Sequence, residues 1–353
     1  MTPREAFNAQ AADRILITDG AFGTEIQNWK LDEAAYAGTL GLTKDQKGNN
    51  DILALTRPEV PESIHRAYFE AGADIAETNT FSANVISQAD YGAEHLVREI
   101  NLESARLARR LADEFQARDA ERGIWRPRFV AGAIGPTNKT LSLSPDVNDP
   151  GYREIDFDHL TGVYRQQIDA LVEGGADFIL IETVFDTLNA KAGIMAALDA
   201  GQALGRDLPI MLSMTLTDLS GRNLSGHTVE AFWHAVRHAR PLTIGLNCSF
   251  GAEQLRPHVK VLSEICDTLI MVYPNAGLPN ELGEYDEMPV TTAGLVGEWA
   301  HAGQVNVLGG CCGSTPAHIK AIADTVRGVP PRRVPVPAVR TRLAGLEPFT
   351  MAA

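Results

Sequence analysis

The chain has 353 residues, enough for one large domain or two of ordinary size. Hydrophobic residues make up 44% and charged residues 22%, the balance of a globular protein with a sizeable core. The formal net charge is -14 and the pI is about 5.1. An acidic surface repels phosphate, which argues against nucleic acid and anionic membrane surfaces as partners.

The N-terminal residues 1–13 carry charges and lack the apolar segment of a secretory signal. No uninterrupted apolar run approaches the roughly 20 residues that cross a bilayer. The sequence therefore predicts a soluble, cytoplasmic protein. Its four cysteines are too few for a disulfide scaffold in a chain of this length, so clustered thiols in a reducing compartment point to metal binding or catalysis.

Short apolar runs alternate with longer segments of helical period along the chain. The apolar runs predict eight strands, at residues 14–19, 74–78, 128–135, 177–183, 208–215, 242–248, 268–274 and 304–310. The segments between and after them predict helices at residues 61–71, 93–115, 158–173, 187–203, 229–240, 252–266, 291–301 and 316–326.

Eight alternating units of this kind indicate an α/β fold, a single-domain (β/α)₈ TIM barrel. A doubly wound sheet is the alternative, but its glycine-rich nucleotide motifs follow none of the predicted strands. We expect an N-terminal extension at residues 1–13 and the barrel at residues 14–326. Residues 327–353 are rich in Pro and Arg and are expected to form a C-terminal tail or linker.

Two connections exceed ordinary loop length. Residues 29–57 follow the first predicted strand, and residues 136–156 follow the third. Loops this long are usually functional in compact domains. Both follow the C-terminal end of a strand, the face on which barrels carry their chemistry.

Three cysteines lie at strand ends. Cys248 closes the sixth predicted strand in IGLNCSFG, and Cys311 and Cys312 follow the eighth in VNVLGGCCGSTP. The C-terminal ends of barrel strands converge on one mouth, so three thiolates can meet there. The alternatives are ordinary buried cysteines, the reading we give to Cys266, or a metal-free nucleophile, which needs a His partner that neither segment supplies.

Zinc suits three thiolates, because it binds sulfur tetrahedrally and three protein ligands leave one position open for a substrate. Such a site lowers the pKa of an incoming thiol. The pattern therefore predicts that an external thiol is activated to attack a carbon electrophile, with Cys248, Cys311 and Cys312 as catalytic and metal-binding residues.

The motifs GLNCSFG and GGCCGSTP resemble those of the homocysteine S-methyltransferases. TDGAFGTEIQ, EAGADIAETNTFSAN, GAIGPTNKTLSLSPD and VYPNAGLPN are similar to the homocysteine-binding module of cobalamin-dependent methionine synthase. The resemblance runs from about residue 14 to about residue 348, but folate, cobalamin and reactivation modules are missing. It implies a split enzyme, a (β/α)₈ barrel with zinc on the three cysteines, and homocysteine as substrate.

Substrate-binding residues are expected at other strand ends. Asp19 ends the first predicted strand, where its carboxylate can hold an ammonium while N–H groups of the following turn, with Ala21 and Phe22, hold a carboxylate. The resemblance makes Glu182 a second partner for the ammonium. Glu77 and Asn79 are expected as polar lining, and the resemblance gives Asn275 the displaceable fourth position on zinc.

The resemblance also implies the reaction. A zinc-bound homocysteine thiolate attacks the methyl group of methylcobalamin carried by a partner protein, and methionine is the product. Separate chains with folate- and cobalamin-binding modules are then the partners. Two alternatives remain, a homocysteine methyltransferase that uses betaine or S-methylmethionine, and a non-catalytic zinc-stabilised subunit that binds a cobalamin protein.

Overall fold

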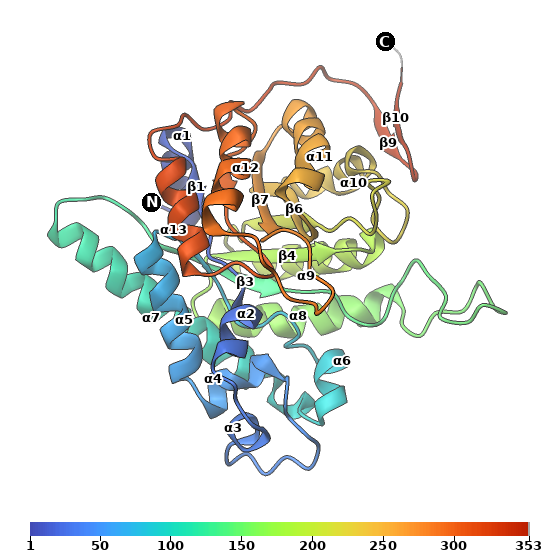
Figure 1. Cartoon of the computed structure of the whole chain (residues 1–353). Helices are drawn as coiled ribbons and strands as arrows, with labels where there is room; N and C mark the ends of the chain where they lie inside the picture. The colour runs from blue at the N-terminus through green and yellow to red at the C-terminus, as the bar shows by residue number, and fades with distance from the viewer. Residues whose placement is uncertain (352–353) are drawn as a thin grey trace.

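Residues 1–351 are described by a computed structural model. Eight parallel strands form one sheet, which helices surround (Figure 1). The strands are β1 (Leu16–Ile17), β2 (Ile75–Glu77), β3 (Phe129–Ile134), β4 (Phe178–Val184), β5 (Ile210–Met214), β6 (Thr243–Gly251), β7 (Leu269–Asn275) and β8 (Val307–Leu308).

The sheet curls into a barrel in the order β1-β8-β7-β6-β5-β4-β3-β2. A parallel bridge between Thr18 and Ile75 links β1 to β2 and completes the ring. The predicted (β/α)₈ TIM barrel is thus confirmed. The ladders of β1 and β8 are shorter than the predicted runs 14–19 and 304–310, because the chain enters from a helix before β1 and turns at Gly309 and Gly310 after β8.

Helices follow the strands as the barrel requires. They are α5 (Glu59–Ala71), α7 (Val97–Glu121), α8 (Phe157–Glu173), α9 (Thr187–Leu204), α10 (Val229–Val236), α11 (Ala252–Ile265), α12 (Pro289–His301) and α13 (Pro316–Thr325). Side-chain caps fix several starts, because Asp156, Asp186 and Thr228 accept hydrogen bonds from the first turns of α8, α9 and α10. The helix predicted at 93–115 begins later and runs longer, as α7.

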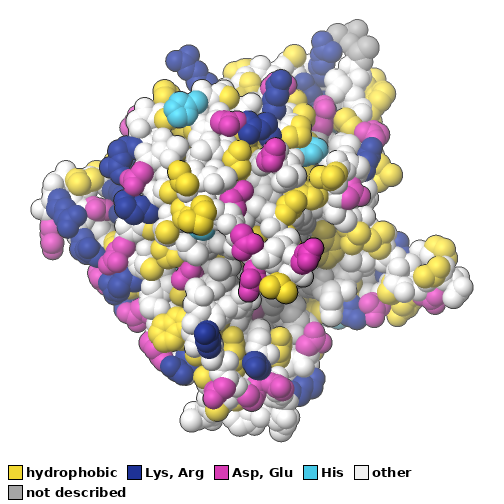
Figure 2. Space-filling view, viewed as in Figure 1, with side chains coloured by type: hydrophobic (Ala, Val, Ile, Leu, Met, Phe, Trp, Pro, Cys, Tyr) yellow, Lys and Arg dark blue, Asp and Glu magenta, His cyan; other side chains and the backbone are white. Residues whose placement is uncertain are grey.

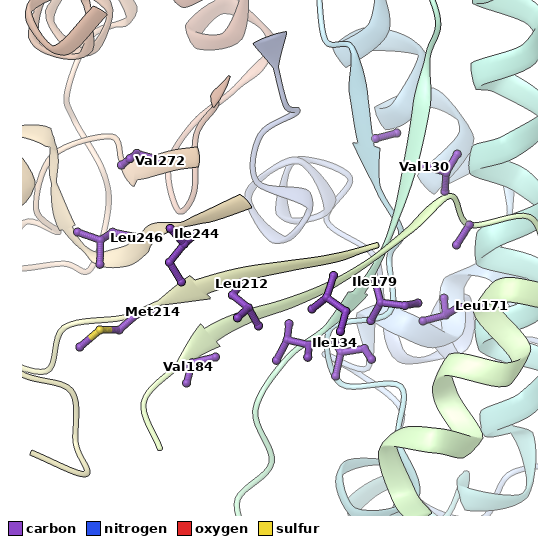
Figure 3. Close-up of a cluster of buried hydrophobic side chains, with 14 of the residues drawn as sticks. Val130, Ile134, Leu171, Ile179, Val184, Leu212, Met214, Ile244, Leu246 and Val272 are labelled. Carbon is purple, nitrogen blue, oxygen red and sulfur yellow. The ribbon is translucent and has the colours of Figure 1, made fainter. Parts of the chain in front are cut away.

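Two hydrophobic cores follow from the alternation of side chains along each strand. Outward-facing residues such as Ile179, Leu212 and Val272 belong to the larger core, and Figure 3 shows Leu171 of α8 beside Ile179. Inward-facing residues such as Phe178 and Met271 fill the barrel itself. The same alternation puts Glu182 on the inner face of β4, two residues beyond Leu180, at the end of the barrel where the strands finish.

The N-terminal residues form a helix, α1 (Pro3–Asp13), which closes the opposite end of the barrel. Phe7 is fully buried there and packs edge-on against Phe178, with ring centroids 5.3 Å apart. Phe129 lies 5.4 Å from Phe7 and 5.3 Å from Phe178, so the three rings contact one another. The amino end of the barrel is therefore sealed by aromatic side chains, and the carboxyl end is left for a pocket.

The long connections carry small elements of their own. The first contains α2 (Phe22–Asn28), α3 (Glu33–Ala37) and α4 (Leu53–Thr56), and the connection after β2 contains α6 (Val85–Gln88). Residues 136–156 have no regular structure and project from the body on the right of Figure 1. Short 3₁₀ turns occur at Asn50–Ile52, Ala89–Tyr91, Glu94–Leu96 and Arg237–Ala239.

The C-terminal segment ends in a hairpin of β9 (Arg342–Ala344) and β10 (Pro348–Thr350), which lies against α10. Before it, the buried guanidinium of Arg332 donates to the carbonyl oxygens of Ser263, Cys266 and Thr268. These bonds fasten the start of the segment to the body. Within residues 1–351, no helix has both the length and the apolar character needed to cross a membrane.

Candidate functional site

A pocket of about 870 Å³ opens at the carboxyl end of the barrel. Its lining includes the three clustered cysteines, Cys248, Cys311 and Cys312, and two acidic residues from strand ends, Glu77 and Glu182. The long first connection adds Ala21, Phe22, Asn49, Asn50 and Asp51. Other connections and β7 add Asn79, Phe81, Tyr91, Tyr273 and Tyr285. Asp and Glu side chains gather near the centre of the face shown in Figure 2.

The three cysteine sulfurs lie within 4.8 Å of one another. The sulfurs of Cys248 and Cys312 are 3.8 Å apart. A tetrahedral zinc ion with Zn–S bonds of about 2.3 Å requires neighbouring sulfurs about 3.8 Å apart, so the cluster fits one metal ion. Cys266, by contrast, is buried in the outer core.

Unusual backbone geometry brings these sulfurs together. Cys248 and Ser249 both have a φ of 60°, the left-handed region that non-glycine residues rarely adopt, and the pairing of β6 with β7 shifts register at this point. After β8, Gly313 has a φ of 79°. The Cys311 N–H donates to the Pro274 carbonyl, which fixes the turn against β7.

The three neighbouring thiols shift one another's pKa values. Hydrogen bonding with Cys248 and then Cys311 lowers the pKa of the Cys312 thiol to about 3. Hydrogen bonding with Cys248 and Cys312, followed by burial, raises the pKa of Cys311 well above its usual range. The cluster thus ionises one thiol readily and holds back the others, and a metal ion must displace the remaining protons when it binds.

Three carboxyl groups gather at the ends of β1, β2 and β4. Asp19 is 2% exposed and accepts hydrogen bonds from the Glu77 N–H at 2.9 Å and the Thr18 hydroxyl at 3.3 Å. The Thr18 hydroxyl also lies 3.3 Å from Glu77 Oε1. The phenol of Tyr273 donates to Glu182 Oε2 at 3.2 Å.

Burial raises the pKa of all three carboxyl groups, and each also feels another member of the cluster. For Asp19 and Glu77 the hydrogen bonds they accept act in the opposite direction, and for Glu182 the Tyr273 phenol does so. Desolvation and mutual repulsion both disfavour the charged forms, and a cation beside these groups would favour the charged forms and lower their pKa values.

The other predicted substrate residues are also near the pocket. Ala21 and Phe22 line it at the start of α2, but the Ala21 N–H already donates to the Ser314 hydroxyl. Phe22 packs its ring against His65. Asn79 lines the pocket, and its amide donates to the Asn50 carbonyl.

Asn275 and Asp19 lie just outside the pocket lining. Asn275 is 1% exposed, and its side-chain oxygen has no hydrogen-bond donor among the described residues. Its neighbour Ala276 donates its N–H to the Cys312 carbonyl, which ties the end of β7 to the cysteine turn. A buried oxygen without a donor is suited to a displaceable contact with a metal ion or a substrate.

Sequence reasoning missed several polar residues of the site. Asn247 precedes Cys248 and lies beneath the pocket, Tyr273 contacts Glu182, and Tyr285 lies close enough to Cys312 to influence the pKa of that thiol. Asp51, buried at the pocket wall, accepts a hydrogen bond from the Ser82 N–H. The alternation of side chains along a strand could have placed Asn247 and Tyr273, because it turns both side chains into the barrel.

Comparisons with known proteins identify the family of the chain and related folds. The metallated form of the homocysteine methyltransferase MmuM from Escherichia coli has 23% sequence identity and a TM-score of 0.69, covering 92% of this chain and 99% of that one. Its apo form has 22% identity and a TM-score of 0.64, with coverage of 92% and 100%. These structures share the fold. The sequence model of the homocysteine S-methyltransferases matches residues 16–326. The chain therefore belongs to the homocysteine S-methyltransferase family, a family of methyltransferases that act on homocysteine.

Proposed function

We propose that this chain converts homocysteine to methionine with zinc held by Cys248, Cys311 and Cys312, and that it takes the methyl group from methylcobalamin carried by a separate protein. One observation supports this most strongly. Three sulfurs with the spacing of a metal site share a pocket with buried carboxyl groups. A small molecule that carries both a thiol and an ammonium group matches the two clusters at once.

The zinc assignment rests on the donor set. Three thiolates and no further charged ligand leave one coordination position for the substrate thiol, and the Asn275 oxygen is the candidate to fill that position when substrate is absent. Zinc on three thiolates supplies a lowered pKa for the bound homocysteine thiol and leaves its sulfur nucleophilic.

The carboxyl cluster accounts for the amino end of the substrate. Glu182 and Asp19 would face the homocysteine ammonium, and Glu77 and Asn79 would complete the polar wall. Burial raises the pKa of each carboxyl above its ordinary value. An arriving ammonium would favour their charged forms and lower these pKa values. The start of α2, with Ala21 and Phe22, is the place we assign to the substrate carboxylate.

The reaction is a displacement at carbon. The homocysteine sulfur forms a bond to the methyl carbon while the bond from that carbon to its donor breaks, and the donor keeps the electron pair. The protein's contribution is to orient the thiolate and to hold the amino-acid end still. Methyltetrahydrofolate alone is a poor donor, because its methyl group is carried by an amine that leaves badly without activation.

The size of the pocket affects which methyl donors can enter it. Its volume of about 870 Å³ far exceeds one amino acid, so a second molecule has room above the sulfur cluster. Residues 136–156 project beside the mouth as an arm, and Val147 on that arm is 94% exposed. A protein that presents a large planar cofactor could dock against this arm and the segment 29–57.

A second candidate donor has its own support. Asp51, Asp90 and Glu284 also line the pocket, and acidic walls suit a small cationic donor such as betaine or S-methylmethionine. The two candidates differ in a measurable way, because the small donors need no partner protein.

A donor comparison tests the proposal. Zinc-loaded protein and homocysteine are mixed in turn with methylcobalamin, betaine, S-methylmethionine or methyltetrahydrofolate, and methionine is quantified. We expect product from methylcobalamin and little from methyltetrahydrofolate. Product only from betaine or S-methylmethionine would overturn the cobalamin assignment. No product from any donor, with zinc still bound, would favour a non-catalytic subunit.

A further inference from the structure

Asn247 lies under the floor of the pocket, one residue before Cys248 on β6. It is 1% exposed. Residues 243, 245 and 247 alternate with the outward-facing Ile244 and Leu246, so the Asn247 side chain points into the barrel. A buried amide in that position needs partners for all of its polar atoms.

Those partners come from three other strand ends. The Asn247 side-chain oxygen accepts hydrogen bonds from the Thr183 N–H at 3.1 Å and the Ser213 hydroxyl at 2.6 Å. Its Nδ2 donates to the Thr183 hydroxyl at 2.8 Å and faces Cys311 Sγ at 3.9 Å. An amide has two lone pairs and two N–H groups, so this set uses its whole capacity.

The backbones of β4 and β6 are irregular near Asn247. Thr183 has a φ of 53° and Cys248 a φ of 60°, and the ladders shift register between Ile181 and Val184 and between Asn247 and Gly251. Left-handed backbone is strained for a non-glycine residue and persists only where surrounding contacts impose it. Two hydrogen bonds of the Asn247 side chain end on Thr183, beside Glu182, and Asn247 itself directly precedes Cys248 on β6.

We propose that Asn247 is a positioning residue that couples the metal-binding sulfurs to the carboxyl that faces the substrate. Through Thr183 it fixes the end of β4 and so the place of Glu182. Through its Nδ2 it orients Cys311 and stabilises negative charge on that sulfur, the task that outer-shell hydrogen bonds perform for metal ligands. The inference rests on the proposed function in assuming that the three sulfurs bind a metal ion and that Glu182 faces the substrate.

The Asn247→Asp variant separates these roles from simple packing. It keeps the size and an acceptor for Thr183 and Ser213, but it puts an oxygen where the Nδ2 donor faces Cys311. Asn306→Asp is the matched control. Asn306 is also 1% exposed, and it accepts from the Ile270 N–H and donates to the Arg332 carbonyl at the amino end of the barrel.

The readouts do not require turnover. Each variant is loaded with cobalt(II), and the sulfur-to-cobalt charge-transfer band, the affinity for the metal in competition with a chelator, and homocysteine binding by calorimetry are measured. For Asn247→Asp we expect a shifted band, a metal affinity lowered roughly 10- to 100-fold, and weaker homocysteine binding. For Asn306→Asp we expect all three to match the wild type.

Folding is checked by circular dichroism, and Asn247→Ser serves as a second variant that removes the donor without adding charge. An unchanged band and metal affinity in either folded Asn247 variant would overturn the inference. The same changes in Asn306→Asp would overturn it as well, because they would reflect loss of stability alone. A wild-type chain that takes up no metal would instead overturn the zinc site on which the proposed function rests.

Discussion

Among single residues, the three clustered cysteines each supply one sulfur to the same point. Replacing Cys312 by Ala leaves two sulfurs, which hold zinc far less tightly than three. We expect Cys312→Ala to lose most of its zinc during dialysis without chelator, as measured by elemental analysis. Cys266→Ala is the control, because Cys266 is buried away from the cluster. Full zinc retention in Cys312→Ala would contradict the site.

In the proposed function, Glu182 faces the ammonium at the other end of the substrate. Changing it to Gln removes a charge-assisted hydrogen bond to the ammonium, an interaction of about 1.5–3 kcal/mol. We expect Glu182→Gln to weaken homocysteine binding roughly tenfold to a hundredfold, as measured by calorimetry, with zinc content unchanged. Because the Tyr273 phenol, which donates to Glu182, can donate equally to the amide oxygen of the variant, the local packing should survive. An unchanged dissociation constant would give Glu182 a purely structural role.

The sequence reveals residues of this kind unevenly. The cysteines stand out because clustered thiols are rare and these three follow apolar runs, whereas the role expected of Glu182 comes from the family resemblance. Asn247 carries an amide that could serve any buried hydrogen bond, and its role depends on partners far away in the chain, at residues 183, 213 and 311. The left-handed backbone at Thr183 and Cys248 is equally hidden, since both residue types usually avoid it.

Among the elements, strands and their following helices were predictable because apolar runs and helical periods are properties of short windows. α1 escaped that reasoning, since it has little amphipathic pattern. Its start nevertheless carries a recognisable signature, with Thr2 as N-cap, Pro3 in the first turn and Glu5 completing a capping box. No local pattern shows where α1 packs, which is at the amino end of the barrel.

Truncating Phe7 tests how much the packing of α1 against the barrel stabilises the fold. Its ring is 0% exposed and contacts Phe129 and Phe178 inside the barrel. Truncation to Ala leaves a cavity, so we expect Phe7→Ala to lower the free energy of unfolding by about 3–5 kcal/mol. Denaturant titration measures this, with Val336→Ala, at 97% exposure, as the control. Equal stability of the two variants would show that α1 is not part of the folded core.

At the scale of the whole molecule, barrel closure depends on a narrow seam. β1 and β2 share a single bridge, between Thr18 and Ile75. Asp74 reinforces the seam, because its N–H donates to the Ile17 carbonyl and its side chain accepts the Ile17 N–H at 2.9 Å. Arg14 and Arg126 both bind the same carboxylate, which is fully buried. One ion cluster thus joins the end of α1, both strands and the segment before β3.

The charge state of Asp74 makes this closure sensitive to acid. Burial alone would raise its pKa, but Arg126 and Arg14 outweigh burial and hold the pKa at about 2, against 3.8 for the unperturbed group. The folded pKa is depressed, so the stabilisation is complete above about pH 4 and disappears as the pH falls toward 2. The shift corresponds to about 2 kcal/mol. Asp19, Glu77 and Glu182 act in the opposite direction, because their folded pKa values are raised.

The variant Asp74→Asn isolates this contribution from those opposing groups. At neutral pH it leaves two partly exposed guanidinium groups without their carboxylate, so the cost should fall below the value of about 3–5 kcal/mol that is typical of a fully buried pair. As the pH falls from 5 to 2, the wild type loses its own Asp74 stabilisation while the variant has none to lose. The difference in unfolding free energy between the two proteins should therefore narrow by about 2 kcal/mol, measured by urea titration at each pH. A gap that stays constant with pH would mean that packing, and not the charge of Asp74, closes the barrel.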